Sequence, residues 1–417
     1  MSLKTTLTRM WLTRSFKPFL FTNEYDEDLK FDDLDNLGLY VHIPFCERIC
    51  NFCPYCKTLY SEELCDRYID ALICEIHKVG SLYPGKKKTT SLYFGGGTPA
   101  LASDRLGEII NAIGEHFVIT EGIGVELHPS NVTSDTLREL KNAGVTKISI
   151  GIQSFGEKFQ KILGRNSVDP DKLRDALNEV PFETVSMDFI FALPDQTYED
   201  IKSDIAKAFE CGANHVAIYP FIDFTFTSSK VKAMPKKEKR ELLDKITAYC
   251  TEKGYPRNSI WTFASKEEAR YSSMTRDNFL GFGCSATTLL RDRFKVNTFS
   301  VEEYCKRIDE GKLPTSLTIK FTLRQRMVYY LFWTAYSTKV DPAGFEKFFG
   351  VPLKKMYGLE FALAKLAGFL TEKDGVYTMT PKGAFYYHYY ENFYTLAYID
   401  KMWGIMRKEA FPEKIVL

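Results

Sequence analysis

A chain of 417 residues has room for two or three domains of ordinary size. Its hydrophobic fraction of 45% and charged fraction of 26% are those of a globular protein and exclude collagen-like, disordered and supercharged classes. The formal net charge of +1 argues against a protein whose main task is to neutralise a nucleic-acid backbone or an anionic membrane. We therefore predict no nucleic-acid partner and no membrane partner.

Hydropathy agrees with this prediction. A membrane-spanning helix needs ~20 mainly apolar residues, and the most apolar stretches, at 185–193 and 328–336, are about half that length. Residues 1–21 lack the continuous apolar segment and the cleavage site of a secretory signal. We expect a cytoplasmic protein, in which the ten cysteines are thiols or ligands rather than disulfides. Six are isolated and are interpreted as small core residues: Cys65, Cys74, Cys211, Cys250, Cys284 and Cys305.

Residues 1–37 are predicted to form an acidic, poorly periodic arm. Its charge runs at 26–28 and 32–35 are typical of a solvated face.

From residue 38 to residue 222, short β-branched or aromatic runs alternate with longer amphipathic segments, a pattern that indicates βα units around a parallel sheet. Thr133 and Thr197 are predicted helix N-caps. Because chemistry collects at the carboxyl ends of parallel strands, we expect the functional residues there. The predicted strands cover residues 39–43, 91–94, 124–126, 147–151, 184–189 and 215–219.

The periodicity weakens over residues 223–315, which we interpret as a connecting region packed on the βα core. From 316 to 417, helices are followed by short β-like runs around residues 368–383. This order is typical of a winged-helix-like domain. The domain is only mildly basic, so we expect it to cover the core rather than to read DNA.

The strongest local signal is a C-x3-C-x2-C triplet, Cys46, Cys50 and Cys53, directly after the first predicted strand. Thiolates at this spacing can wrap an iron–sulfur cluster, and three ligands leave one iron with an open coordination position. Two other interpretations are a zinc knot that adds Cys56 and a thioredoxin-like redox pair of Cys53 and Cys56. Zinc sites usually combine two separated ligand pairs, and the redox motif belongs to a smaller fold, so we favour the cluster.

The run from His42 to Cys46 that leads into this triplet, with Phe52 beside Cys53, resembles the radical S-adenosylmethionine (SAM) superfamily. More narrowly, it is similar to the oxygen-independent coproporphyrinogen III oxidase group. The resemblance extends from residue 38 to the carboxyl terminus and continues through GGGTP at 95–99, Glu126, GIQSF at 151–155, LGR at 163–165, MD at 187–188 and LPDQT at 193–197. It implies an α/β fold with a partial parallel (β/α)6 barrel at 38–222 and an α-helical, winged-helix-like carboxyl-terminal domain.

The resemblance also implies that Cys46, Cys50 and Cys53 hold a 4Fe–4S cluster beside a SAM pocket. Glycines after a strand allow close backbone approach to a ligand, and Arg165 could grip a carboxylate as a bidentate fork. Glu126, at a strand end, would need a partner such as an ammonium group or a ribose hydroxyl. The implied pocket residues are Tyr40, Phe52, Gly95, Gly96, Gly97, Thr98, Glu126, Gln153, Arg165 and Asp188.

The implied reaction is reductive cleavage of SAM followed by hydrogen abstraction from a substrate, with the protein orienting the cofactor. The implied substrate is a porphyrinogen or another tetrapyrrole. The implied electron donor is a small protein such as a flavodoxin or a ferredoxin.

Departures from the family pattern keep alternatives open. The late glycine turn at 279–286 ends in Cys284, Ser285 and Ala286 and lacks the histidine of the heme-chaperone branch. Residues 271–277 lack the segment that precedes this turn in coproporphyrinogen dehydrogenases, whereas the turn itself and Asn297 match that branch better. The alternatives are therefore a different tetrapyrrole, methyl transfer with a second SAM, or a non-catalytic heme chaperone.

Cys56 stands three residues beyond the triplet, where the family often has a cysteine two residues beyond. It is interpreted as a bystander thiol or, functionally, as a relay of hydrogen or protons near the substrate.

The substrate prediction draws on two further sets of side chains. Arg276, Arg324 and Arg326 could meet propionates, although arginines are commonly solvated. The aromatic residues of the carboxyl-terminal domain are interpreted mainly as core and alternatively as a stacking wall for a flat ring: Tyr329, Tyr330, Phe332, Trp333, Tyr386, Tyr387, Tyr389, Tyr390, Phe393 and Tyr394.

Overall fold

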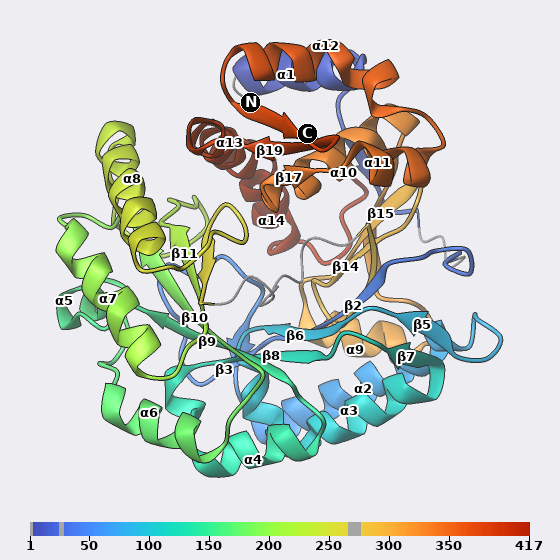
Figure 1. The fold of residues 1–417 in the computed structure, drawn as a ribbon. Helices are drawn as coiled ribbons and strands as arrows, with labels where there is room; N and C mark the ends of the chain where they lie inside the picture. The colour runs from blue at the N-terminus through green and yellow to red at the C-terminus, as the bar shows by residue number, and fades with distance from the viewer. Residues whose placement is uncertain (1–2, 25–28, 266–276) are drawn as a thin grey trace.

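The computed structural model describes residues 3–24, 29–265 and 277–417, and a large sheet forms its centre (Figure 1). The strand order of this sheet is β12-β11-β10-β9-β8-β6-β2-β13-β14-β15-β16-β1-β20. Neighbouring strands from β11 to β13 are all parallel. Six of them correspond to the predicted strands, and the α/β prediction is confirmed: β2 (Leu37–Ile43), β6 (Leu92–Gly96), β8 (Ile123–Leu127), β9 (Lys147–Gln153), β10 (Thr184–Phe191) and β11 (His215–Pro220).

Each of these strands has one apolar face because side chains alternate along a strand. In β2, Leu39, Val41 and Ile43 are buried in the main core, whereas Tyr40 and His42 point to the other face. Helices follow the strands and lie along the outside of the sheet (Figure 1). They are α2 (Glu62–Gly80), α3 (Ser103–His116), α4 (Ser134–Asn142), α5 (Glu157–Ile162), α6 (Pro170–Glu179) and α7 (Tyr198–Glu210).

The predicted caps are in place. The Thr133 side chain accepts from the backbone of Thr136 at the start of α4, and Thr197 forms a capping box with Asp200 at the start of α7. Short elements complete this half of the chain: β5 (Lys87–Thr89) paired with β7 (Phe117–Ile119), and the 3-10 turns η1 (Pro99–Ala102) and η2 (Pro129–Asn131).

The expected connecting region contributes directly to the main sheet. β13 (Asn278–Phe282) pairs in parallel with β2 and is a seventh parallel strand that the sequence analysis missed. The sheet then continues antiparallel through β14 (Thr287–Leu289), β15 (Arg293–Asn297) and β16 (Thr315–Lys320). The boundary predicted after residue 315 therefore falls inside β16. The other elements of this region are α8 (Lys236–Glu252), β12 (Thr262–Ala264), which is antiparallel to β11, and α9 (Val301–Asp309).

The amino-terminal arm has more regular structure than expected. α1 (Leu3–Thr13) buries Thr5, Arg9 and Thr13, one face at a four-residue spacing, and packs against α10 (Leu323–Tyr336). β1 (Leu20–Thr22) lies between β16 and β20 (Lys414–Val416). The expected solvated face does exist at the exposed Asp32, Asp33 and Asp35, while the acidic run at 26–28 lies outside the described residues.

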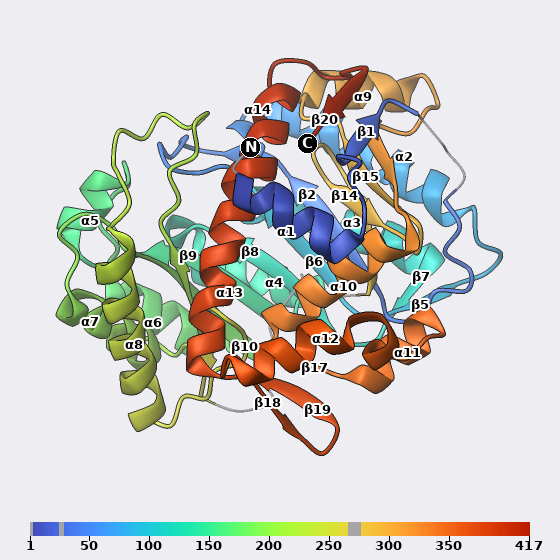
Figure 2. The ribbon, with the colours of Figure 1, turned by 90° about the horizontal axis from the view of Figure 1, so that it is seen from above.

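The carboxyl-terminal part combines helices with a small three-stranded sheet of order β17-β19-β18, in agreement with the winged-helix-like prediction. Met327, Phe345, Leu353 and Tyr357 give it a core of its own. Figure 2 shows α13 and α14 as one long rod that crosses the molecule beside α1. The elements are α10, β17 (Lys339–Val340), α11 (Pro342–Phe349), α12 (Leu353–Leu366), β18 (Leu370–Lys373), β19 (Val376–Met379), α13 (Pro381–Tyr394), the π-helical turn η3 (Thr395–Ile399) and α14 (Asp400–Met406).

In the part of the chain that the structure describes, every helix is too short or too polar to cross a lipid bilayer.

Candidate functional site

The three cysteines of the triplet lie on one loop at the carboxyl end of β2. The loop is closed by a short parallel pairing of β3 (Phe45–Cys46) with β4 (Thr58–Leu59). All three thiols are free and partly exposed. Arg165 Nε donates to Cys50 Sγ at 3.3 Å, so a basic group already lies beside the sulfurs. Three accessible thiols on one loop, with a cation beside them, suit the binding of a metal cluster.

The glycine turn at the end of β6 packs directly under this loop. A Cβ atom on Gly97 would lie 2.4 Å from the carbonyl oxygen of Phe45, a distance that no real side chain tolerates. Gly96 has φ +122°, and a Cβ there would lie 2.8 Å from the His42 ring. Backbone hydrogen bonds join the two segments, from Gly97 N to Ile43 O and from Thr98 N to Phe45 O. The glycines are therefore required first by close packing against the cysteine loop, a reason that the sequence alone did not provide.

Two carboxylates from β8 and β10 approach each other at the same edge of the sheet. Glu126 accepts hydrogen bonds from the Tyr93 hydroxyl at 3.0 Å and from Gly96 N at 3.2 Å. Burial, followed by the nearby charge of Asp188, raises the pKa of Glu126 to about 7. Asp188 accepts from the hydroxyls of Ser149 at 2.9 Å and Ser186 at 3.2 Å, and burial raises its pKa to about 6. Such a pair favours ligand groups that donate hydrogen bonds or carry positive charge.

The other predicted pocket residues lie at neighbouring strand ends. Gln153, at the end of β9, has φ +70°, an uncommon conformation for a residue with a side chain. Arg165 stacks on Phe52, with 5.7 Å from its guanidinium carbon to the ring centre, and donates to the Gly151 carbonyl. The Tyr40 hydroxyl lies 3.1 Å from His42 Nδ1, and the Thr98 hydroxyl lies 4.0 Å from Cys46 Sγ. The predicted residues therefore come together around one strand edge.

The carboxyl-terminal segment reaches over this edge, which the sequence analysis did not foresee in detail. Arg407 donates to the carbonyl of Pro54 in the cysteine loop, and the Trp403 ring lies 6.1 Å from the Tyr55 ring. Asp400 accepts two hydrogen bonds from Thr225, at 2.8 and 2.7 Å. These contacts join residues far apart in the chain, and no local pattern marks them.

Tyr219 lies near the end of β11. Its side chain is 39% exposed, yet burial raises its pKa well above the ordinary value, followed by the effects of Tyr336, Asp188 and Tyr55. A group that reaches solvent but is largely surrounded by protein can contact a ligand.

The predicted aromatic residues include both buried and partly exposed rings. Tyr330 is buried against Phe345 in the carboxyl-terminal core, as the core interpretation expects. Phe332 is partly exposed and stacks on Tyr387 with ring centres 5.2 Å apart.

The arginines expected to meet propionates are placed differently. Arg326 is 2% exposed and donates to the backbone carbonyls of Leu290 and Asp277, so it is not available to a ligand. Arg324 donates to the Met356 carbonyl at 3.4 Å. Arg276 and the rest of the 271–276 segment lie outside the described residues.

Comparison with known proteins finds a family model that matches the core. Residues 40–208 match the family model described as the Radical SAM superfamily. The matched segment is therefore similar to a class of domain whose cofactors are a 4Fe–4S cluster and SAM.

The chain is similar to two kinds of named relative. It is 29% identical to the heme chaperone HemW of Lactococcus lactis over 282 residues, which cover 64% of this chain and 73% of that protein. It is 28% identical to the oxygen-independent coproporphyrinogen III oxidase of Cereibacter sphaeroides, over 67% of this chain and 68% of that protein. Among solved structures, coproporphyrinogen III oxidase (HemN) from Escherichia coli aligns with a TM-score of 0.76 at 21% identity, over 95% of this chain and 98% of that chain. This alignment shows a shared fold across both halves of the molecule.

Proposed function

We propose that the protein is a radical SAM enzyme that acts on a porphyrinogen or a related tetrapyrrole. The observation that carries the proposal is the convergence of the cysteine loop, the glycine turn and the two carboxylates at one edge of the parallel sheet. Their donor types fit the two cofactors, because thiolates bind iron and paired carboxylates suit a ligand that carries an ammonium group and ribose hydroxyls.

Cys46, Cys50 and Cys53 are assigned to the cluster. The SAM pocket is assigned to Tyr40, Phe52, Gly95, Gly96, Gly97, Thr98, Glu126, Gln153, Arg165 and Asp188. When bound, the two cofactors supply reductive cleavage of a carbon–sulfur bond and hydrogen abstraction from the substrate.

The residues of the chain would bind and orient these groups. Glu126 and Asp188, both partly buried, accept hydrogen bonds and stabilise positive charge. Arg165, already beside Cys50 Sγ, favours a carboxylate close to the cluster. The carboxyl-terminal rod, held to the cysteine loop by Arg407, would limit the entry of water.

A tetrapyrrole is favoured as the substrate by the relative named coproporphyrinogen III oxidase and by the aromatic side chains at the site. Tyr55 and Tyr219 are 53% and 39% exposed, and Trp403 lies against Tyr55. Exposed aromatic faces suit a flat macrocycle. Arg407, beside these rings, replaces the predicted Arg326 as the candidate partner for a propionate.

The test is an anaerobic assay of the reconstituted protein with a reduced flavodoxin or ferredoxin as electron donor. Cleavage of SAM and the products from a panel of tetrapyrroles would be followed by mass spectrometry. We expect cleavage coupled to loss of mass from one porphyrinogen. Cleavage with every tetrapyrrole recovered unchanged would contradict the substrate class and leave the radical chemistry standing.

A second candidate is a heme chaperone, because two of the relatives carry that name. It predicts tight heme binding without turnover of any tetrapyrrole, which the same assay separates. Methyl transfer with a second SAM would instead give a product heavier by one methylene group.

A further inference from the structure

Three side chains outside the proposed cofactor pocket converge below the glycine turn. They are His42 on β2, Cys56 at the end of the cysteine loop and Cys284 in the turn after β13, with side chains 3%, 8% and 0% exposed. One ligand atom from each lies within 4.8 Å of the other two. The two sulfurs are 4.0 Å apart. Two thiols and an imidazole from three separate segments therefore lie close together in the interior.

The spacing suits a bound cation better than a disulfide. Two sulfurs on one tetrahedral zinc, each with a bond of ~2.3 Å, lie about 3.8 Å apart. A disulfide would require the sulfurs of Cys56 and Cys284 to approach to about 2.05 Å.

The imidazole is oriented as in metal sites, where a ligating histidine uses its second nitrogen for a hydrogen bond. His42 Nδ1 faces the Tyr40 hydroxyl at 3.1 Å, while Nε2 faces Cys56 O at 2.9 Å and the Ser285 hydroxyl at 3.3 Å. A tyrosine hydroxyl can donate or accept, so Nδ1 can carry the proton when a cation replaces the one on Nε2.

We propose that His42, Cys56 and Cys284 bind a thiophilic divalent cation, zinc, at a site separate from the cysteine triplet. Two thiolates would neutralise the cation, and an imidazole with two thiolates is a common zinc ligand set. The Ser285 hydroxyl, 3.3 Å from His42 Nε2, is the side-chain oxygen that we assign to the fourth position. Ser285 has φ +56°, a conformation that a serine adopts at some cost, and it places the hydroxyl beside His42.

Such a site would stabilise the cysteine loop. Cys56 ends the loop only three residues after Cys53, while His42 lies on β2 and Cys284 follows β13, the strand that pairs with β2. The His42 ring also lies directly against Gly96. One cation would thus join the loop to the parallel sheet and hold the triplet over the glycine turn.

The test measures zinc in a protein that cannot bind metal at the triplet. In a Cys46→Ser/Cys50→Ser/Cys53→Ser background, we expect one zinc per chain by elemental analysis after dialysis against micromolar zinc. Adding Cys284→Ser should weaken zinc binding at least tenfold. Cys250→Ser, which changes another fully buried cysteine, is the matched control and should leave it unchanged.

A second measurement uses the intact chain, in case the triple variant does not fold. The wild-type protein, reconstituted anaerobically with iron and sulfide and then given cobalt, should show a cobalt–thiolate charge-transfer band that Cys284→Ser removes or halves and Cys250→Ser retains. Zinc or cobalt binding that is unaffected by Cys284→Ser would overturn the proposal. So would protein that binds neither metal under anaerobic conditions and that an added thiol oxidant converts to a Cys56–Cys284 disulfide in peptide maps, since the pair would then be a redox couple.

Discussion

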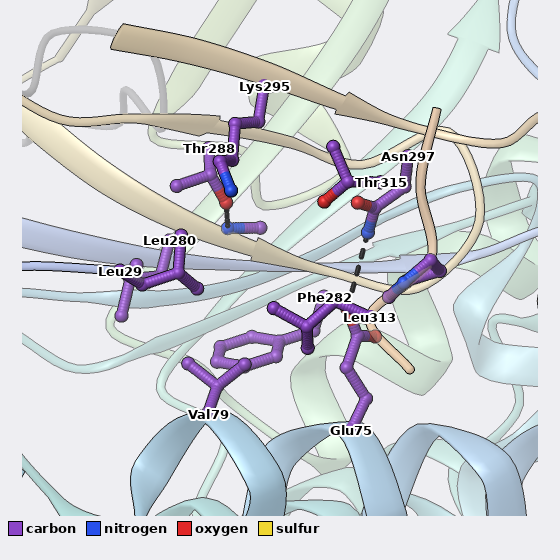
Figure 3. A pocket seen from close by; sticks show the side chains of 12 residues that line it. Leu29, Glu75, Val79, Leu280, Phe282, Thr288, Lys295, Asn297, Leu313 and Thr315 are labelled. Atoms are coloured by element: carbon purple, nitrogen blue, oxygen red, sulfur yellow. Dashed lines mark hydrogen bonds between the residues drawn. The ribbon is translucent and has the colours of Figure 1, made fainter. Parts of the chain in front are cut away.

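Glu75 is a buried residue that fixes the turn after β13. Its carboxylate accepts hydrogen bonds from Gly283 N at 2.7 Å, from the Tyr304 hydroxyl at 2.6 Å and from Asn297 Nδ2 at 3.3 Å. Figure 3 shows Glu75 reaching up from α2 toward Asn297 beside a small cavity. Asn297, which the sequence analysis noted as a family match, therefore has a structural partner. Glu75 itself carried no sequence signal.

The first prediction concerns the pH dependence of stability. Burial raises the pKa of Glu75 from its ordinary value of 4.5 to about 7. Between these pH values the folded state retains a proton that the unfolded state has released, so this residue's contribution falls as pH rises from 4.5 to 7 and is constant above. The total change is roughly 3 kcal/mol. Urea unfolding should show the wild type losing stability relative to Glu75→Gln across this window. Parallel curves of unfolding free energy against pH for the two proteins would refute the prediction. The control is Glu241→Gln, which changes an exposed carboxylate.

The second prediction concerns Arg165. If it holds the carboxylate of SAM, Arg165→Ala leaves that charge poorly paired, at a cost of roughly 2–5 kcal/mol. Calorimetry on the cluster-loaded protein should show SAM affinity reduced by more than tenfold. Arg174→Ala, on the surface of α6, should bind SAM as the wild type does. Equal SAM affinities for all three proteins would mean that Arg165 does not bind SAM and only makes its contacts with Cys50 and Gly151.

At the scale of elements, the two ends of the chain are joined. β1 is hydrogen-bonded to β16 on one side and to β20 on the other, and α1 packs on α10. The Arg14–Glu360 ion pair and the hydrogen bond from the Tyr357 hydroxyl to Leu12 O add further contacts. A chain that ends near residue 315 would lose β16 and β20 together. Deleting the carboxyl-terminal part would therefore disrupt the main sheet as well as remove the elements that cover the site.

The third prediction follows from the pairing of β1 with β16 and β20. Removal of residues 1–24 takes away β1, the strand that pairs with β20, and exposes the face of α10 that α1 covers. We expect a clearly lower thermal midpoint and greater protease sensitivity at the carboxyl terminus. Leu7→Ala, at an exposed position of α1, should leave the midpoint unchanged. A truncated protein as stable as the full chain would show that the arm is dispensable.

At the scale of the whole molecule, the features that depend on local sequence patterns could be predicted, whereas the contacts between distant residues could not. The six strands were predictable because alternation in segments such as 184–189 reports directly on a half-polar face. The same alternation places Tyr40, Glu126 and Asp188 on one side of the sheet. In contrast, β13 pairs with β2 across about 240 residues, and Cys56 meets Cys284 across a separation of 228. Neither pairing has a signature in the neighbouring sequence.

The most direct test of the central claim is reductive cleavage of SAM by anaerobically reconstituted protein, measured beside its iron content. The wild type and the control Cys250→Ala should hold about four irons per chain and release 5′-deoxyadenosine when reduced. Cys50→Ala should lose both properties. Full iron loading with unchanged cleavage in Cys50→Ala would contradict the assignment of Cys46, Cys50 and Cys53 as the cluster ligands.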